Sequence, residues 1–297
     1  MNREENIKFF DPQITVKNKS VKDRLQFLPN SKVPLPSEVE ISESGVCNRK
    51  CSFCPRSDPG YEEVNEFISF DLHKKLCDQL KEVNYSGLII YSGFVEPLLD
   101  KNIYNLILQT KSNLPNARVE MVTNGDVLNI NRLNMLFKSG LDTILISVYD
   151  GPEDAKMFET MCIEARLNAD QYVIRHRYFK EEKDFGLTIS NRAGMMKNAK
   201  YKIMPLKKEL KAKCFYPGYT FFMDYNGDVL MCPHDWGKKI ILGNLNHKTF
   251  KEIWTSKKAI NLRKKLNEGN RKFAPCNVCD VNGELIGKKH AEVWDTI

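Results

Sequence analysis

The chain has 297 residues, of which 42% are hydrophobic and 28% are charged, and a formal net charge of +7. This composition is ordinary for a globular protein with one large domain and a smaller one. No segment approaches the roughly 18 consecutive apolar residues that a bilayer-spanning helix needs, and residues 1–10 lack the apolar core of a signal peptide. We therefore expect a cytoplasmic protein that has no membrane partner.

The basic excess lies mainly in the last third of the chain, in short runs such as Lys207-Lys208 and Arg263-Lys264-Lys265. Solvated helix faces are the simplest explanation, because lysine is rarely buried. An anionic substrate is the first alternative and nucleic acid the second. Nucleic acid is the less favoured of the two, because no recognition motif of basic and aromatic residues accompanies the charge.

The first half of the chain alternates strand and helix patterns after an extension at residues 1–36, where prolines limit regular structure. Strands are expected at Glu38–Ser42, Ser86–Ser92, Arg118–Thr123, Thr143–Val148 and Gln171–Arg177. Helices are expected at Asp71–Val83 with Asp71 as N-cap, Lys101–Lys111, Asn131–Ser139 and Glu153–Arg166. This alternation indicates parallel βαβ units, which bind ligands at the carboxyl ends of their strands.

The pattern becomes irregular from about Tyr178 and then gives a strong hairpin signal. Asn226-Gly227 separates two strand-like segments, Tyr219–Asp224 and Asp228–Cys232. Helical stretches follow near Thr249–Ser256 and Lys257–Asn267. The sequence therefore predicts an α/β fold in two parts. Residues 37–205 would form a partial, open parallel β/α barrel of about five to six strands, and residues 206–297 a small α+β domain.

Nine cysteines in a chain without an export signal point to metal binding or catalysis more than to disulfides. Cys47, Cys51 and Cys54 have the spacing C-x₃-C-x₂-C in the loop after the first expected strand. Three thiolates would leave one iron of a [4Fe–4S] cluster open for a ligand. Zinc is the alternative, but a structural zinc site normally has a fourth cysteine or histidine ligand close in sequence. The nearest histidine is His73, 19 residues after Cys54.

This cysteine loop, with the aromatic Phe53 before its third cysteine, resembles that of the radical S-adenosylmethionine enzymes. The likeness continues at the ends of the next three strands. Their sequences are Tyr91-Ser92-Gly93-Phe94-Val95-Glu96-Pro97-Leu98-Leu99, Thr123-Asn124-Gly125 and Ile146-Ser147-Val148-Tyr149-Asp150-Gly151. The resemblance implies that S-adenosylmethionine contacts Phe53, Ser92, Gly93, Glu96, Thr123, Asn124 and Ser147.

The same resemblance implies the chemistry. The open iron would chelate S-adenosylmethionine, and reductive cleavage of the cofactor would give a 5′-deoxyadenosyl radical that abstracts hydrogen from a substrate. An electron donor such as flavodoxin or ferredoxin would be the protein partner.

A second group of cysteines lies in the last third of the chain: Cys214, Cys232, Cys276 and Cys279. By residue type alone, four thiolates fit either a fully ligated [4Fe–4S] cluster or tetrahedral zinc. Their spacing around the hairpin resembles the SPASM/twitch extension of radical S-adenosylmethionine enzymes, which implies an auxiliary [4Fe–4S] cluster. No cysteine follows Cys279, so the shorter twitch form with one cluster is expected. Cys77 and Cys162 fall in helical patterns and are expected to be buried structural thiols.

The resemblance also implies a reaction. An auxiliary cluster can take the second electron when a secondary alcohol is oxidised. Arg192 lies in a stretch similar to one near the reaction centre of such enzymes, and it is predicted to be the catalytic base or electrostatic partner for the departing hydroxyl proton. Arg175 and Arg177 are the alternatives for this role. The 36 residues before the first strand are fewer than a peptide-recognition domain needs, which favours a small polyol, aminocyclitol or sugar-type substrate. The alternatives are an epimerase, a peptide-modifying maturase, and a non-enzymatic zinc or iron–sulfur protein.

Overall fold

The computed structural model describes residue 21 and residues 23–178, 190–197 and 203–297. Within these ranges, no helix is both long enough and apolar enough to cross a membrane.

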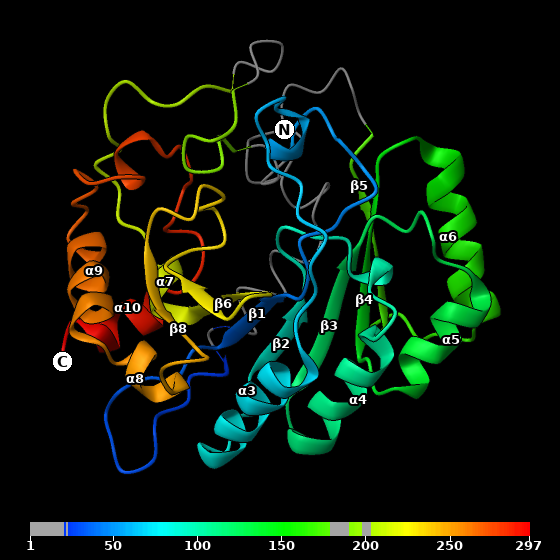
Figure 1. The fold of residues 1–297 in the computed structure, drawn as a ribbon, viewed down its shortest axis with the longest axis horizontal. Coiled ribbons are helices and arrows are strands. Elements are labelled where there is room, and N and C mark those ends of the chain that lie inside the picture. Colours follow the sequence, from blue (N-terminus) through cyan, green and yellow to red (C-terminus); the bar gives the residue numbers. More distant parts are fainter. Residues whose placement is uncertain (1–20, 22, 179–189, 198–202) are drawn as a thin grey trace.

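One eight-stranded sheet, in the order β5-β4-β3-β2-β1-β6-β7-β8, runs through the molecule (Figure 1). Its strands are β1 (Glu38–Ser42), β2 (Leu88–Tyr91), β3 (Arg118–Thr123), β4 (Thr143–Val148), β5 (Tyr172–His176), β6 (Thr220–Asp224), β7 (Asp228–Leu230) and β8 (Ile241–Asn244). Strands β1 to β6 run parallel to one another, and the pairs β6–β7 and β7–β8 are antiparallel. The sheet does not close, so the predicted partial barrel is confirmed.

Four helices connect the parallel strands and lie along one side of them (Figure 1). They are α3 (Phe70–Glu82), α4 (Ile103–Asn113), α5 (Ile130–Lys138) and α6 (Pro152–Glu164). The C-terminal part adds α7 (Tyr216–Tyr219), α8 (Phe250–Trp254), α9 (Lys257–Asn267) and α10 (Lys288–Trp294). Short 3-10 turns stand at η1 (Pro55–Ser57), η2 (Pro97–Leu99) and η4 (Cys276–Val278).

The prediction that Asp71 caps the first of these helices is wrong. Helix α3 begins one residue earlier, and the side chain of Ser69 accepts a hydrogen bond from the backbone N–H of Leu72. Asp71 instead lies in the first turn, where its charge still favours the positive end of the helix. Serine and aspartate are comparable N-caps, so the composition of this stretch could not decide between them.

The predicted hairpin is confirmed, and it joins the core sheet. Gly227 adopts a positive φ of 88° in the turn between β6 and β7. Strand β6 pairs in parallel with β1, Glu38 opposite Thr220. The predicted boundary at residues 205/206 therefore lies between segments that contribute to the same sheet.

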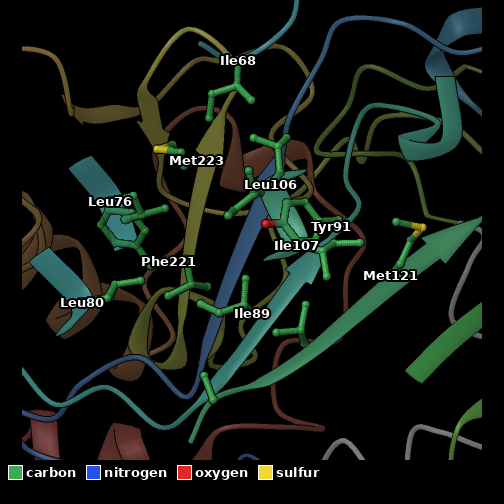
Figure 2. Close-up of a cluster of buried hydrophobic side chains, with 14 of the residues drawn as sticks. Ile68, Leu76, Leu80, Ile89, Tyr91, Leu106, Ile107, Met121, Phe221 and Met223 are labelled. Carbon is green, nitrogen blue, oxygen red and sulfur yellow. The ribbon is translucent and has the colours of Figure 1, made fainter. Parts of the chain in front are cut away.

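A single apolar layer fills the space between the sheet and the helices (Figure 2). Leu76 and Leu80 of α3 pack there with Phe221 of β6 and Ile89 of β2, and all four are at most 1% exposed. Cys77 and Cys162 are also buried, as expected. Polar side chains such as Ser92, Thr123 and Ser147 gather instead at or near the carboxyl ends of the strands.

Candidate active site

A cavity of about 870 Å³, including its open mouth, lies at the carboxyl ends of the parallel strands. Cys47, Cys51 and Cys54 line it together. The other residues predicted to bind S-adenosylmethionine line the same cavity, namely Phe53, Ser92, Gly93, Glu96, Thr123, Asn124 and Ser147. Every residue of the first predicted site is thus brought to one place.

The base of the cysteine loop is held by Arg56, which is 2% exposed. Its Nη2 donates to the carbonyl oxygens of Gly45 and Phe94, both at 2.7 Å, and its guanidinium pairs with Glu63. Because Gly45 precedes the cysteines and Phe94 lies in the loop after β2, one buried side chain fixes the two loops against each other.

Arg49, inside the cysteine loop, fastens it to two further strand ends. Its guanidinium forms bidentate contacts with Asp126, after β3, and with Asp150, after β4. Asn48 adds a hydrogen bond of 2.7 Å to Asp126. Bidentate arginine–carboxylate pairs fix geometry as well as charge. The cysteine loop is therefore fixed to the segments that follow β3 and β4.

Glu96 is the buried carboxylate of the cavity, at 2% exposure. Thr123 Oγ1 donates to its Oε1 at 2.5 Å, and the backbone N–H of Asn124 donates to its Oε2 at 2.7 Å. Burial raises the pKa of Glu96 to about 7, although these hydrogen bonds act in the opposite direction. A carboxylate oriented in this way is suited to pair with an ammonium group.

The loop after β2 approaches the sheet closely at Gly93. Its φ is 104°, and a side chain there would lie 3.0 Å from the ring of Phe222 and 3.1 Å from Ser42. Ser42 Oγ accepts the backbone N–H of the next residue, Phe94, at 3.2 Å. Glycine is required here because larger residues rarely adopt this conformation and would meet the ring.

Arg192 forms the far wall of the cavity, together with Trp236 of the C-terminal part. Its guanidinium carbon lies 5.9 Å from the centre of the Trp236 indole. Trp236 in turn packs on Phe94, with ring centres 4.5 Å apart. Arg175 lines the cavity as well, whereas Arg177 is buried and is not among the residues described along its wall.

A second, small cavity lies in the C-terminal part, and all four of its predicted cysteine ligands line it: Cys214, Cys232, Cys276 and Cys279. Cys276 comes from the 3-10 turn η4 and Cys279 follows it directly. Gly283 packs so closely on Cys214 that a Cβ at this position would collide with the sulfur atom. The structure thus gathers the second predicted site too.

Asn191 connects the two cavities. Its side chain donates to the carbonyl oxygen of Val278, inside the Cys276–Cys279 segment, at 2.6 Å and accepts from the backbone N–H of Gly194 at 3.1 Å. The next residue, Arg192, lines the first cavity, and Ala193 lines the second. One short segment therefore separates the two sites and is anchored to the cysteine turn.

Both cavities fit iron–sulfur clusters by their donor chemistry. Burial raises the pKa of Cys51 to about 12 and that of Cys279 to about 11, so these thiols stay protonated unless a metal replaces the proton. Among the described residues, no three His, Cys, Asp or Glu side chains converge tightly enough to hold a single metal ion. The ligands of a cubane bind different irons and need no such common point.

Tyr149 belongs to the stretch at the end of the fourth strand that was matched to the family, and it packs on Phe53 with ring centres 5.3 Å apart. Trp236, Arg49 and Arg56 escaped prediction from sequence, and Trp236 closes the cavity from a distant segment. Arg49 lies within the cysteine motif and Arg56 just after it, and this position in the sequence could have indicated that they belong to the site. Nothing local could identify Trp236, because its place depends on the pairing of β6 with β1.

The comparisons agree with this arrangement. Residues 41–190 match the model of the radical SAM superfamily, and residues 214–280 match SPASM, an iron–sulfur cluster-binding domain. The S-adenosyl-L-methionine-dependent 2-deoxy-scyllo-inosamine dehydrogenase of Niallia circulans is 29% identical over 245 residues, which cover 82% of this chain and 92% of that protein.

Solved structures are similar as well. The crystal structure of BtrN in complex with AdoMet and 2-DOIA has a TM-score of 0.70 and 27% identity, covering 84% of this chain and 96% of BtrN. Native anSMEcpe with bound AdoMet has a TM-score of 0.51 and 12% identity, over 87% of this chain and 96% of that one. The second likeness concerns the fold alone.

An open parallel sheet with thiols and a buried carboxylate at its strand ends defines an enzyme that uses a metal cluster and a small cofactor. The chain belongs to the radical SAM superfamily. It is an oxidoreductase that uses S-adenosylmethionine and a [4Fe–4S] cluster, and its SPASM-type domain carries iron–sulfur in addition. The alternative of a non-enzymatic zinc or iron–sulfur protein is wrong.

Proposed function

We propose that the enzyme oxidises a secondary alcohol of a small polyol, aminocyclitol or sugar-type substrate. We further propose that Cys47, Cys51 and Cys54 hold the cluster with the open iron. The auxiliary [4Fe–4S] cluster would be held by Cys214, Cys232, Cys276 and Cys279. In this division, residues 37–205 are the radical core and residues 206–297 the auxiliary domain.

The observation that carries the proposal is the position of Arg192 and Ala193. These consecutive residues line the two cavities, so a substrate beside Arg192 lies between the abstraction site and an electron acceptor. Two such sites on either side of one substrate suit the removal of a hydrogen atom, a proton and an electron from the same alcohol. The similarity to a dehydrogenase that covers 92% of that relative supports the same reaction.

The residues of the cavity would divide the work as follows. Glu96, oriented by Thr123 and Asn124, would accept hydrogen bonds from the amino group of S-adenosylmethionine. Phe53 and Tyr149 would form an apolar wall that excludes water. Arg192 would donate hydrogen bonds to the substrate oxygen and stabilise the negative charge that develops as the hydroxyl proton leaves.

When bound, the cluster and S-adenosylmethionine supply hydrogen abstraction, and the auxiliary cluster supplies an acceptor for the second electron. The first electron is proposed to come from a small donor protein such as flavodoxin or ferredoxin.

The ligand assignment is tested by counting iron and acid-labile sulfide after anaerobic reconstitution. Two [4Fe–4S] clusters predict about eight irons per chain, and the Cys47→Ala, Cys51→Ala, Cys54→Ala triple variant should retain about four. A Cys77→Ala, Cys162→Ala variant is the matched control and should retain all of them. A triple variant that still binds about eight irons would contradict the assignment.

The reaction is tested with 2-deoxy-scyllo-inosamine and related polyols under reducing, oxygen-free conditions. Oxidation predicts a product lighter by two hydrogens and one S-adenosylmethionine consumed per product. Arg192→Lys should lower kcat by at least about tenfold with S-adenosylmethionine binding unchanged, because a point charge does not reproduce the planar fork of the guanidinium. If no tested alcohol loses two hydrogens, the proposal fails.

Epimerisation is the second candidate reaction. It requires a thiol that returns a hydrogen atom to the substrate, and Cys77 and Cys162 were the free thiols available for it. Neither is among the described residues that line the cavity. Incorporation of one solvent deuterium without a net loss of hydrogen would favour epimerisation over oxidation.

A further inference from the structure

Arg271 is a cation buried at the second cavity. It follows helix α9, is 1% exposed and lines the cavity together with the four cysteines. Within the part of the chain that the structure describes, no carboxylate forms an ion pair with it. A buried charge normally costs several kcal/mol unless it is paired. The position therefore calls for a negative partner.

The hydrogen bonds of Arg271 fix the guanidinium without neutralising it. It donates to the carbonyl oxygens of Ala212 at 2.9 Å, Lys213 at 2.8 Å and Val281 at 3.0 Å. Lys213 directly precedes Cys214, and Val281 follows Cys279 by two residues. The side chain thus joins the two segments that bring these cysteines to the cavity and keeps its charge beside them.

The wall of the second cavity places the side chain of Arg271 beside Cys214, Cys276 and Cys279. The other charged residue on the cavity wall is Asp235, whose carboxylate accepts the backbone N–H groups of Lys239 and Ile240. Asp235 is thus stabilised by its own turn, whereas Arg271 lines the cavity with its charge paired to no carboxylate among the described residues.

We propose that Arg271 is the fixed counter-charge of the auxiliary cluster and raises its reduction potential. The inference rests on the proposed binding of that cluster by the four cysteines. A [4Fe–4S] cluster in the 2+ state with four thiolates carries a net charge of −2, and one added electron makes it −3. A nearby positive charge stabilises the more negative form, which favours acceptance of an electron.

The test uses the full-length Cys47→Ala, Cys51→Ala, Cys54→Ala chain, in which the auxiliary cluster is observed alone. Its midpoint potential is measured by a redox titration followed by electron paramagnetic resonance. Arg271→Gln should shift the potential to a more negative value with about four irons still bound. Arg271→Lys should shift it by less than half as much, because the charge remains.

The matched control is Arg263→Gln. Arg263 is equally buried in the same domain, between the rings of Trp254 and Trp294, but it does not line the cavity. Its loss should lower the melting temperature and leave the potential unchanged. A shift in this control comparable to that of Arg271→Gln would make the effect one of general destabilisation and overturn the proposal.

The remaining outcomes also decide. An unchanged potential in Arg271→Gln, or equal shifts in the glutamine and lysine variants, would reduce Arg271 to a scaffold for the loops. If Arg271→Gln loses its iron, the lysine variant decides. A lysine variant that keeps both the iron and the reduction potential supports the proposal that the positive charge acts on the cluster. A lysine variant that also loses its iron overturns the proposal. A parent chain without auxiliary iron removes the basis of the inference. The midpoint potential does not depend on alcohol oxidation. A failure of the proposed reaction can therefore be distinguished from a failure of this inference.

Discussion

Glu96 is the buried carboxyl group at the wall of the first cavity, and its proposed role is to hold the amino group of S-adenosylmethionine. Its carboxylate is held by Thr123 and by the backbone of Asn124. Glu96→Gln removes the charge and keeps the shape, so S-adenosylmethionine should bind roughly ten- to a hundredfold more weakly, the range for a lost charge-assisted hydrogen bond. Equilibrium binding to the reconstituted enzyme measures this, with Glu62→Gln, at an exposed position, as the control. Equal weakening in both variants would contradict the assignment.

The raised pKa of Glu96 predicts a pH dependence of binding. Burial brings this pKa to about 7 in the cofactor-free protein. Below that value the carboxyl must lose a proton before it can pair with an ammonium group, so affinity should fall about tenfold per pH unit between pH 7 and pH 5. The dissociation constant measured across this range should be flat in Glu96→Gln. An unchanged slope in that variant would assign the dependence to another group.

The same shift has a defined sign for stability. The folded state binds the proton of Glu96 more tightly than the unfolded state does, because the folded pKa is raised above the ordinary value of 4.5. The contribution of Glu96 is therefore most favourable below pH 4.5 and is lost as the pH rises toward 7. In the cofactor-free enzyme, replacement by glutamine should relieve this loss.

Cys47, Cys51 and Cys54 were recognisable from sequence because their spacing is local. Glu96, Thr123 and Ser147 were predicted from the resemblance to the radical S-adenosylmethionine enzymes, in stretches that follow or end the expected strands. Trp236 and Arg271 could not be found, since they reach the cavities through pairing of distant segments. The local sequence pattern of apolar and polar residues does not reveal that a charged side chain is buried.

At the level of elements, the segment around Asn191 controls the position of Arg192. The Asn191 side chain, 0% exposed, contacts Met204, Val278, Gly194 and Asp280 through hydrogen bonds. Asn191→Ala should destabilise the protein by about 2–4 kcal/mol, from several net hydrogen bonds. It should also reduce product formation at least tenfold while S-adenosylmethionine binding stays near normal.

The control for this prediction is Asn277→Ala, because Asn277 lies in the same cysteine turn with its side chain exposed. Thermal unfolding and turnover, measured on both variants, separate the two effects. Normal turnover in a destabilised Asn191→Ala would show that the segment does not need this anchor.

The strands and helices were largely predictable, and their ends less so. β1, β3, β4 and α9 begin and end at the predicted residues. The error at Asp71 arose because two residues suited to cap a helix, Ser69 and Asp71, stand on either side of Phe70, where α3 begins. The order of the sheet beyond β1 was hidden, because the hairpin pattern does not specify which strand it joins.

For the whole molecule, the shared core predicts one cooperative unit. Phe221 of β6 packs with Leu76 and Leu80 of α3 (Figure 2). Phe221→Ala should cost about 3–5 kcal/mol, the range for a buried phenylalanine. Amide hydrogen exchange should then accelerate in β2 and α3 as well as in β7. The control is Phe70→Ala, since Phe70 is 50% exposed. Acceleration confined to residues 206–297 would indicate two independent units.

The pairing of β1 with β6 has a consequence for biosynthesis. Glu38 emerges from the ribosome long before its partner Thr220, and at usual rates of translation the interval is roughly ten to forty seconds. During this time one side of β1 has no neighbour to complete the sheet, and unpaired strand edges invite aggregation. Chaperones that bind the chain during synthesis should therefore raise the yield of intact enzyme, because they protect that edge until the last third of the chain arrives.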